Sequence, residues 1–497
     1  MTTIQIVLVV YIIICAGIGI WSSKFQTNAS EFYVAGKRLG PVILGLAISS
    51  TIMSGMGFVG SVGSIYRDGY APMTIMIFAT MGTMVSYLLL AEPLRRVSGK
   101  YGYVTLSDFA YNRFQSEGAR LVVTIATIIG VTGYIMTNLA SLGTVVALVT
   151  GWSYFTSLTV GVIVVAIYVM MGGMLAAAIT DAFQSVLMMI LGVSFAIVAL
   201  QNAGGVTQMN TVLGSVEGNL TEFIRPGTNY GLIYFVGTAL MYGLGVGGQP
   251  HVVNKFYQIN KKSKWKRSMF IATLSYFLVG ASHIAGLGGR AQTIMGTFQD
   301  TLDNVNNFSS LFTFENFPPI FAGIMMAAIV AAMMSTCDSQ VVTVTGAFCK
   351  DLIFRYFYKK KMDDKKEMLI TRIVMGIIIL VAYLLVFNPP QFLMWMGNGA
   401  WGICASVLIP VLVLGARWKR GNKYAAIIAG VVGIAGSFGL VVLTSVTSLT
   451  LPVNAAVIGT LASTITYIVL TLILPDQPNE LVEVLHDKAA AMSDDEE

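Results

Sequence analysis

A short polar stretch, AAMMSTCDSQ at residues 331–340, lies in the middle of a long apolar segment. On a helix with 3.6 residues per turn, four of its residues share one face: Ala332, Ser335, Thr336 and Ser339. Hydroxyl oxygens and free main-chain carbonyls can together surround a hard monovalent cation such as sodium. Hydroxyls in membrane helices also bond their own backbone, so by themselves they favour helix packing over an ion site. Asp338, at the edge of this face, favours an ion site over simple helix packing, because a carboxylate at membrane depth is costly and usually has a function.

A second carboxylate, Asp181, stands in the stretch AAAITDAFQSVLMM at the start of another predicted helix. Asp181 or Thr180 could cap that helix, with Gln184 answering as in a capping box. Alternatively, the Asp181 carboxylate could lie on the path of an ion through the membrane. The sequence leaves both roles open.

The composition places these residues inside a membrane protein. Of 497 residues, 55% are hydrophobic and only 11% are charged, whereas soluble domains carry about a quarter charged residues. Apolar runs long enough to cross a bilayer recur along the chain, and in lipid such runs must be helical. We therefore expect an all-α membrane protein with about thirteen transmembrane helices. The predicted helices lie near residues 3–22, 40–64, 73–94, 118–149, 153–172, 180–202, 229–250, 267–288, 316–355, 369–387, 392–415, 423–444 and 451–474.

The basic residues predict the orientation. With the N-terminus outside, all but three of the 30 Lys and Arg residues fall on the inner side, as the positive-inside rule requires. The basic clusters KKSKWKR and YKKKMDDKK are then topological anchors at the bilayer, and no nucleic-acid contact is expected. We expect a multi-pass protein that suits a bacterial inner membrane, with the acidic C-terminal tail, residues 476–497, in the cytoplasm.

The sequence lacks the motifs of common enzyme sites. It contains no Walker loop, dinucleotide fingerprint or nucleophile elbow. The four cysteines fit no metal site, and glycine pairs such as those in GVGGQ lie in apolar helices, where they favour close packing or unwinding. We predict that the protein is not an enzyme.

Two of the predicted helices are interrupted. The second, GLAISSTIMSGMGFVGSVGS, crowds Ser, Thr and Gly into one span, which favours a break near residues 50–55. The seventh, MYGLGVGGQPHVV, has four glycines before Pro250, which lacks an amide hydrogen and interrupts a helix. Interrupted helices at matching positions of two halves indicate an inverted-repeat transporter. The single transmembrane domain, 1–475, would comprise a first helix and inner loop (1–39), repeat one (40–202), repeat two (229–415) and two extra helices (423–475).

At these residues the chain resembles the sodium:solute symporter family, whose members share a leucine-transporter-type core of five plus five helices in inverted repeat. AAMMSTCDSQ looks like the family's sodium-site segment, GGMLAAAITDAFQSVLM like the start of its sixth helix, and EFYVAGKRLGPV like its first inner loop. The resemblance implies Na+ as the coupling ion. The implied sodium site uses the carbonyls of Ser50, Met53 and Ala332 and the hydroxyls of Ser335 and Thr336. A second ion or proton path is implied at Asp181, Asp338 and Ser339, although the family has a hydroxyl in place of Asp338.

Residues of the seventh predicted helix indicate which kind of solute the protein carries. GQPH, ending at His251, is similar to the branch of the family that carries proline. That branch has aromatic residues where this chain has Tyr242 and Val246, and an aspartate where it has Ile52. HIAGLGGRA, FPPIFAGIMMAAIVAAMMST and NPPQFLMWM look more like the pantothenate and monocarboxylate branches. The resemblance implies a small organic solute: a carboxylate such as pantothenate or a monocarboxylate, or an amino acid such as proline. The implied substrate pocket uses Ser54, Gly55, Tyr242, Val246, Gln249, Pro250, Trp395 and Asn398.

The predicted function is sodium-coupled symport by alternating access, in which external sodium raises the affinity for the solute. Its partners are then the solute, the sodium ion and the lipid bilayer. Two alternatives stay open. A proton relay through Asp338 and Asp181 could replace sodium, or the chain could be a membrane sensor or an anchor for a partner protein.

Overall fold

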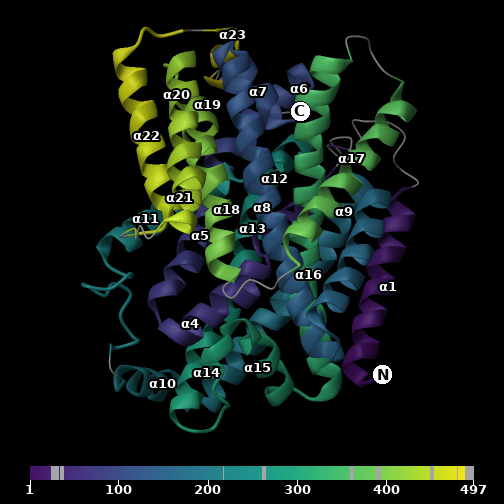
Figure 1. Ribbon diagram of the computed structural model, residues 1–497, viewed down its shortest axis with the longest axis vertical. Coiled ribbons are helices and arrows are strands. Elements are labelled where there is room, and N and C mark those ends of the chain that lie inside the picture. The colour runs from purple at the N-terminus through teal and green to yellow at the C-terminus, as the bar shows by residue number, and fades with distance from the viewer. Residues whose placement is uncertain are drawn as a thin grey trace.

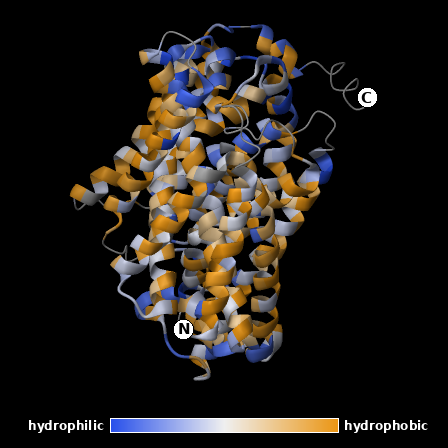
Figure 2. Ribbon diagram, turned by 90° about the vertical axis from the view of Figure 1, so that its right-hand side faces the viewer, coloured by the Kyte–Doolittle hydropathy of each residue, from blue (hydrophilic) through white to orange (hydrophobic). Residues whose placement is uncertain are grey.

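The structure is a computed structural model that describes residues 1–23, 33, 39–216, 218–259, 265–358, 363–387, 393–447, 451, 453–477 and 479–486. Within those residues every regular element is a helix, and one isolated β-bridge joins Leu39 to Ile259. Most long helices run along the long axis of the molecule (Figure 1). Hydrophobic residues cover its middle and hydrophilic residues gather at its two ends (Figure 2). The prediction of an all-α membrane protein is confirmed.

Ten helices are long and apolar enough to cross a membrane within the described part of the chain, or eleven with one bent pair. The ten are Thr3–Ser22, Ala71–Tyr101, Glu117–Thr150, Gly173–Asn202, Trp265–Ile294, Pro319–Phe357, Asp364–Leu385, Met396–Arg417, Lys423–Thr444 and Ala455–Ile473. The bent pair joins Pro41–Ile52 to Met56–Asp68 at 53°. Two further apolar helices, Tyr154–Ile167 and Leu232–Gly243, are too short to count by length. The predicted number of thirteen therefore stays a prediction.

The bounds of the elements follow the chain as labelled in Figure 1. The α-helices are α1 (Thr3–Ser23), α3 (Pro41–Ile52), α4 (Val62–Asp68), α5 (Thr74–Ser86), α6 (Glu92–Tyr101), α7 (Leu106–Phe114), α8 (Glu117–Thr150), α9 (Tyr154–Asn202), α10 (Gly205–Gly214), α11 (Leu232–Gly243), α12 (Pro250–Val253), α13 (Trp265–Gly280), α14 (Ile284–Ile294), α15 (Phe308–Asn316), α16 (Pro319–Gly346), α17 (Asp364–Leu385), α18 (Leu393–Leu408), α19 (Gly415–Arg417), α20 (Lys423–Ile434), α21 (Leu440–Val446), α22 (Ala455–Ile473) and α23 (Glu480–His486). The 3-10 and π-helical segments are η2 (Met56–Ser61), η3 (Ala71–Met73), η4 (Tyr87–Ala91), η5 (Gly245–Gly248), η6 (Asn254–Gln258), η7 (Ala281–His283), η8 (Leu302–Asn307), η9 (Ala347–Phe357), η10 (Ile409–Leu414) and η11 (Ala435–Gly439).

The second predicted helix is broken where its Ser and Gly content indicated. α3 ends at Met53, whose φ of −81° and ψ of 120° are extended, and the helix resumes at η2. Gly55 stands at this point because the neighbouring helix α8 comes very close. A Cβ atom added there would lie 2.5 Å from the side chain of Ser141, nearer than any real contact. The predicted break near residues 50–55 is confirmed.

The seventh predicted helix is also broken, as Pro250 indicated. α11 tightens into η5, Gln249 adopts an extended conformation, and α12 begins at Pro250. A proline at the first position of a helix costs little, because the missing amide hydrogen would have no partner there. Pro250 therefore starts α12, whereas α11 already ends at Gly243 among the glycines.

The predicted fifth and sixth helices are two arms of one element. α9 runs from Tyr154 to Asn202 and kinks at Gly173, whose φ of 51° lies in a region that favours glycine. The second arm is helical from Gly173 onwards, so it starts well before the predicted residue 180. This earlier start changes the position of Asp181, as described below.

The core of the molecule lies around α16 and α18, and the span Met396–Arg417, which contains most of α18, is 89% buried in its most apolar part. In the most apolar part of Pro319–Phe357, 83% of the residues are buried, against 22% for Thr3–Ser22. α16 packs against α9, α8 and α1, while α3 packs against α13 and α9. The polar stretch of α16 is thus enclosed by other helices, and the peripheral α1 faces outwards.

Candidate functional site: an oxygen cage at a broken helix

The broken end of α3 lies against the polar face of α16. Ser335 Oγ lies 3.1 Å from the carbonyl oxygen of Ser50 and 3.2 Å from that of Ala332. Thr336 Oγ1 lies 2.9 Å from the carbonyl oxygen of Met53 and 3.0 Å from that of Ala332. All five residues of the predicted sodium site therefore meet at one place. We refer to these five oxygens as the oxygen cage.

The cage exists because α3 ends inside the protein. The last carbonyls of a helix have no partner within the helix, and here they receive hydroxyl donors from α16. The carbonyl of Thr51 takes part as well, 3.2 Å from Thr336 Oγ1, although Thr51 was not among the predicted residues. All these oxygens are neutral, and a hydroxyl can rotate its hydrogen away to offer lone pairs. The arrangement can hold a small cation of single charge.

A buried ion pair lies next to the cage. Lys255 Nζ of η6 is 2.9 Å from Asp181 Oδ2 of α9, and both side chains are fully buried. Two hydroxyls approach the same carboxylate oxygen, Thr51 Oγ1 at 3.3 Å and Ser339 Oγ at 3.4 Å. Lys255 was not among the predicted residues, because the basic cluster that follows it was interpreted as an anchor at the bilayer. Its isolation from that cluster by five apolar and polar residues was the only available signal.

Asp181 does not cap a helix. It lies inside the second arm of α9, and the Thr180 hydroxyl bonds the carbonyls of Ala176 and Ala177, each at 2.9 Å. Gln184 donates instead to the hydroxyl of Tyr11 in α1. The capping-box interpretation is wrong because the helix begins earlier than the sequence indicated.

Asp338 and Ser339, predicted together, point to different neighbours. Ser339 joins the Asp181 oxygen, whereas Asp338 Oδ1 accepts from the main-chain N–H of Ser339. Asp338 therefore contacts the backbone of its own helix, whereas Ser339 reaches α9.

A small cavity lies on the other side of the α3 break. Its volume is about 20 Å³, and its lining comes from the break itself, α5, α11, α13, η7 and α18. Met53 and Ser54 form part of this lining, together with the aromatic residues Tyr242 and Trp401. These two rings stack with their centroids 5.1 Å apart. The described residues that line the cavity include no Asp, Glu, Lys or Arg.

The cavity takes in some of the predicted pocket residues. Ser54 and Tyr242 line it; the Ser54 hydroxyl lies 2.7 Å from the Tyr134 hydroxyl, and Tyr242 donates to the side chain of Asn398. The main-chain N–H of Gly55 is held by the side chain of Asn138 at 2.9 Å. These contacts fix the backbone at the break.

Other described residues of the predicted pocket are not among the residues that line the cavity, and their contacts are with the protein backbone or core. The amide of Gln249 donates to the carbonyls of Gly245 and Trp401, at 3.2 and 3.1 Å. Val246 is buried and Pro250 starts α12. The side chain of Trp395 lies outside the described residues. Trp401 was missed, although it lies on the same helix.

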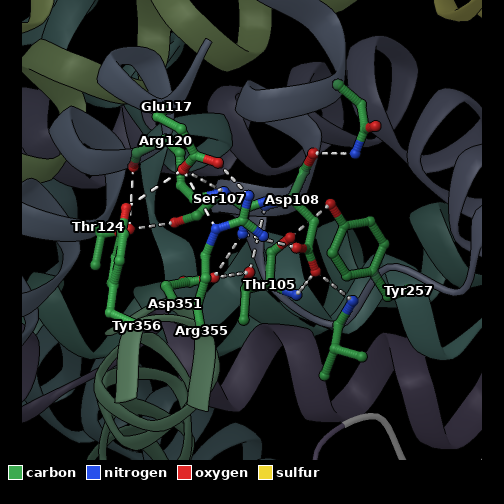
Figure 3. A network of polar contacts seen from close by, with 12 residues as sticks. Thr105, Ser107, Asp108, Glu117, Arg120, Thr124, Tyr257, Asp351, Arg355 and Tyr356 are labelled. Atoms are coloured by element: carbon green, nitrogen blue, oxygen red, sulfur yellow. Dashed lines mark hydrogen bonds and ion pairs between the residues drawn. The ribbon is translucent and has the colours of Figure 1, made fainter. Parts of the chain in front are cut away.

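A polar network closes the end of the molecule where α7 lies (Figure 3). Arg120 is 3.1 Å from Asp108 and 3.4 Å from Asp351, and the Thr105 hydroxyl donates to Asp351 at 2.9 Å. The hydroxyl of Tyr257 in η6 reaches the carbonyl of Thr105 at 3.4 Å. The network thereby links α7, α8, η9 and η6.

Comparison with known proteins identifies the class. The model of the sodium:solute symporter family matches residues 32–433, and the chain belongs to this family. It is 29% identical over 431 residues to the osmoregulated proline transporter OpuE of Bacillus subtilis, with 86% of each chain covered. It is 30% identical over 437 residues to a sodium/proline symporter of Staphylococcus aureus, covering 86% of this chain and 83% of that one.

Solved structures show the same fold. A Na+-coupled sialic acid symporter, whose substrate-bound outward-open structure revealed a novel Na+-site, superposes with a TM-score of 0.79 at 18% identity, covering 97% of this chain and 99% of that chain. Mhp1, a nucleobase-cation-symport-1 family transporter, superposes with a TM-score of 0.51 at 13% identity, covering 95% and 99%. The fold is the leucine-transporter type. The protein is a multi-pass membrane transporter and not an enzyme, and sodium is its coupling ion.

Proposed function

We propose that this protein moves a small carboxylate-bearing solute together with sodium, with proline as the first candidate. The position of Met53 carries the proposal. Its carbonyl faces Thr336 Oγ1 at 2.9 Å, and the same residue lines the central cavity. An ion held by that carbonyl fixes the backbone that forms one wall of the solute pocket. The coupling is reciprocal, so bound solute raises the affinity for sodium by the same factor.

The proposed sodium ligands are the five atoms of the oxygen cage: the carbonyls of Ser50, Met53 and Ala332 and the hydroxyls of Ser335 and Thr336. The carbonyl of Thr51 is a sixth candidate, at 3.2 Å from Thr336 Oγ1. Two of the five atoms, the carbonyls of Ser50 and Met53, come from the end of α3, and the other three come from the continuous helix α16. Sodium binding would therefore join the broken helix α3 to α16.

The cavity supports a small solute of low net charge. No acidic or basic side chain other than His283 is found among its described lining residues, so a dianion would lack a partner. The helix that resumes after Gly55 directs the positive end of its dipole at the break, where it favours a carboxylate. Apolar and aromatic walls suit a compact ring or short chain. The two similar proteins named as proline carriers fit this description.

The structure fits a closed stage of alternating access. A cavity of about 20 Å³ has room for about one water molecule, so side chains must move apart before a solute enters. We place the N-terminus outside and the C-terminal tail in the cytoplasm of a bacterial inner membrane, in agreement with the positive-inside rule. The Figure 3 network then lies on the inner side and keeps it closed.

The test is uptake into proteoliposomes under an inward sodium gradient at fixed pH. Labelled proline, pyruvate, acetate and pantothenate are compared, each with sodium replaced by potassium in a matched control. Sodium-driven accumulation of one solute establishes the function and names the substrate. Accumulation driven by a proton gradient alone would contradict the proposal and favour a relay through Asp338 and Asp181. No transport of any solute in this panel would contradict the choice of solute class.

A further inference from the structure

The groups around Asp181, beside the oxygen cage, resemble the ligands of a second cation site. The cation in this place is a side chain of the protein itself. One carboxylate oxygen of Asp181 receives two hydroxyls, from Thr51 at 3.3 Å and Ser339 at 3.4 Å. A carboxylate and two hydroxyls from three different helices are ligands that suit a hard cation. The cation present is the ammonium of Lys255, 2.9 Å from the same oxygen.

The ion pair with Asp181 accounts for the buried position of the lysine. A buried charge needs a partner, and both side chains of this pair are fully buried. A basic residue near the end of a membrane helix normally extends its amine towards water. Lys255 instead directs its amine inwards, to a carboxylate on another element. Its position is therefore defined by Asp181 and not by solvent.

The pair is in direct contact with the cage. Thr51 connects the two, because its carbonyl accepts from Thr336 at 3.2 Å while its hydroxyl approaches Asp181 at 3.3 Å. Ser339 follows Thr336 by three residues on α16, close to one turn. A second sodium at Asp181 would thus lie next to the first, and Lys255 already supplies that charge.

We propose that the Lys255 ammonium is a built-in substitute for a second sodium ion, so that each transport cycle uses one sodium, bound in the oxygen cage. This inference rests on the proposed function, because it assumes that the cage binds sodium. It gives Lys255 the role of setting the ion stoichiometry. It also explains why Asp181, although buried among hydroxyls, is not an open step on an ion path.

The experiment measures equilibrium binding of radiolabelled sodium alone to the purified full-length protein in lipid nanodiscs. The wild type is expected to bind one sodium per chain. In Lys255→Met the side chain keeps its approximate length but loses its charge, and Asp181 becomes free to hold an ion. This variant is expected to bind two sodium ions per chain.

Two matched controls isolate the charge. Lys255→Arg keeps the cation and is expected to bind one sodium, and the neutral pair Asp181→Asn with Lys255→Met is also expected to bind one. The neutral pair carries no unpaired buried charge, so it shows whether the unpaired Asp181 carboxylate is what destabilises Lys255→Met.

The outcomes separate the two proposals. Two sodium ions bound to the wild type would overturn the role of Lys255 and leave the proposed function intact. A folded Lys255→Met that binds one sodium with unchanged affinity would also overturn it. No sodium binding to the wild type would remove the proposed function, and the inference with it.

Discussion

Replacing Thr336 with valine tests the oxygen cage most directly. The substitution exchanges a hydroxyl for a methyl group of similar size in a fully buried position. Thr336 Oγ1 lies 2.9 Å from the Met53 carbonyl, 3.0 Å from that of Ala332 and 3.2 Å from that of Thr51. Valine therefore removes one proposed sodium ligand and the shared neighbour of three others.

The size of the effect follows from these contacts. Losing one hydrogen-bonding partner at a buried site costs about 1–3 kcal/mol, which corresponds to about a 5- to 150-fold change in affinity. We expect the sodium concentration for half-maximal uptake to rise by such a factor in Thr336→Val. Thr336→Ser retains the hydroxyl and should stay within a few-fold of the wild type.

The assay has to separate ion binding from stability. Sodium that binds only the folded protein stabilises it in proportion to the logarithm of concentration over the dissociation constant. The midpoint of thermal unfolding should therefore rise with sodium in the wild type and in Thr336→Ser, and much less in Thr336→Val. If Thr336→Val keeps both the wild-type sodium dependence of uptake and the wild-type thermal response, the cage does not bind the coupling ion.

Three further substitutions test neighbouring features. Gly55→Ala places a Cβ 2.5 Å from Ser141, and this overpacking should cost about 1–3 kcal/mol of stability. The loss should appear as a lower unfolding temperature. Adding Ser141→Gly should restore the unfolding temperature, and no recovery would contradict the packing argument. Tyr242→Phe removes the donor to Asn398 and should raise the KM for solute several-fold while the unfolding midpoint in sodium alone keeps its response to sodium; an unchanged KM would place the solute elsewhere. Asp351→Asn removes the ion pair with Arg120 and should lower stability by about 1–3 kcal/mol in a thermal unfolding assay, whereas an unchanged midpoint would show that the Figure 3 network does not hold the fold closed.

The sequence by itself determined the features that depend on neighbouring residues. The class of membrane protein follows from the length of the apolar runs. The break at Met53 follows from the serines and glycines around it, and the break at Pro250 follows from the missing amide hydrogen. The pairing of Ser335 and Thr336 on one helix face follows from helical spacing. Each of these is a property of one segment, so no other part of the chain was needed.

Only the tertiary structure decided which distant residues meet. Lys255 and Asp181 are 74 residues apart, and their contact depends on the kink at Gly173 and on where α9 starts. The place of Trp401 in the wall of the cavity depends likewise on how its helix is rotated in the bundle. Helix rotation is set by packing against several neighbours at once, and no local pattern of residues specifies it.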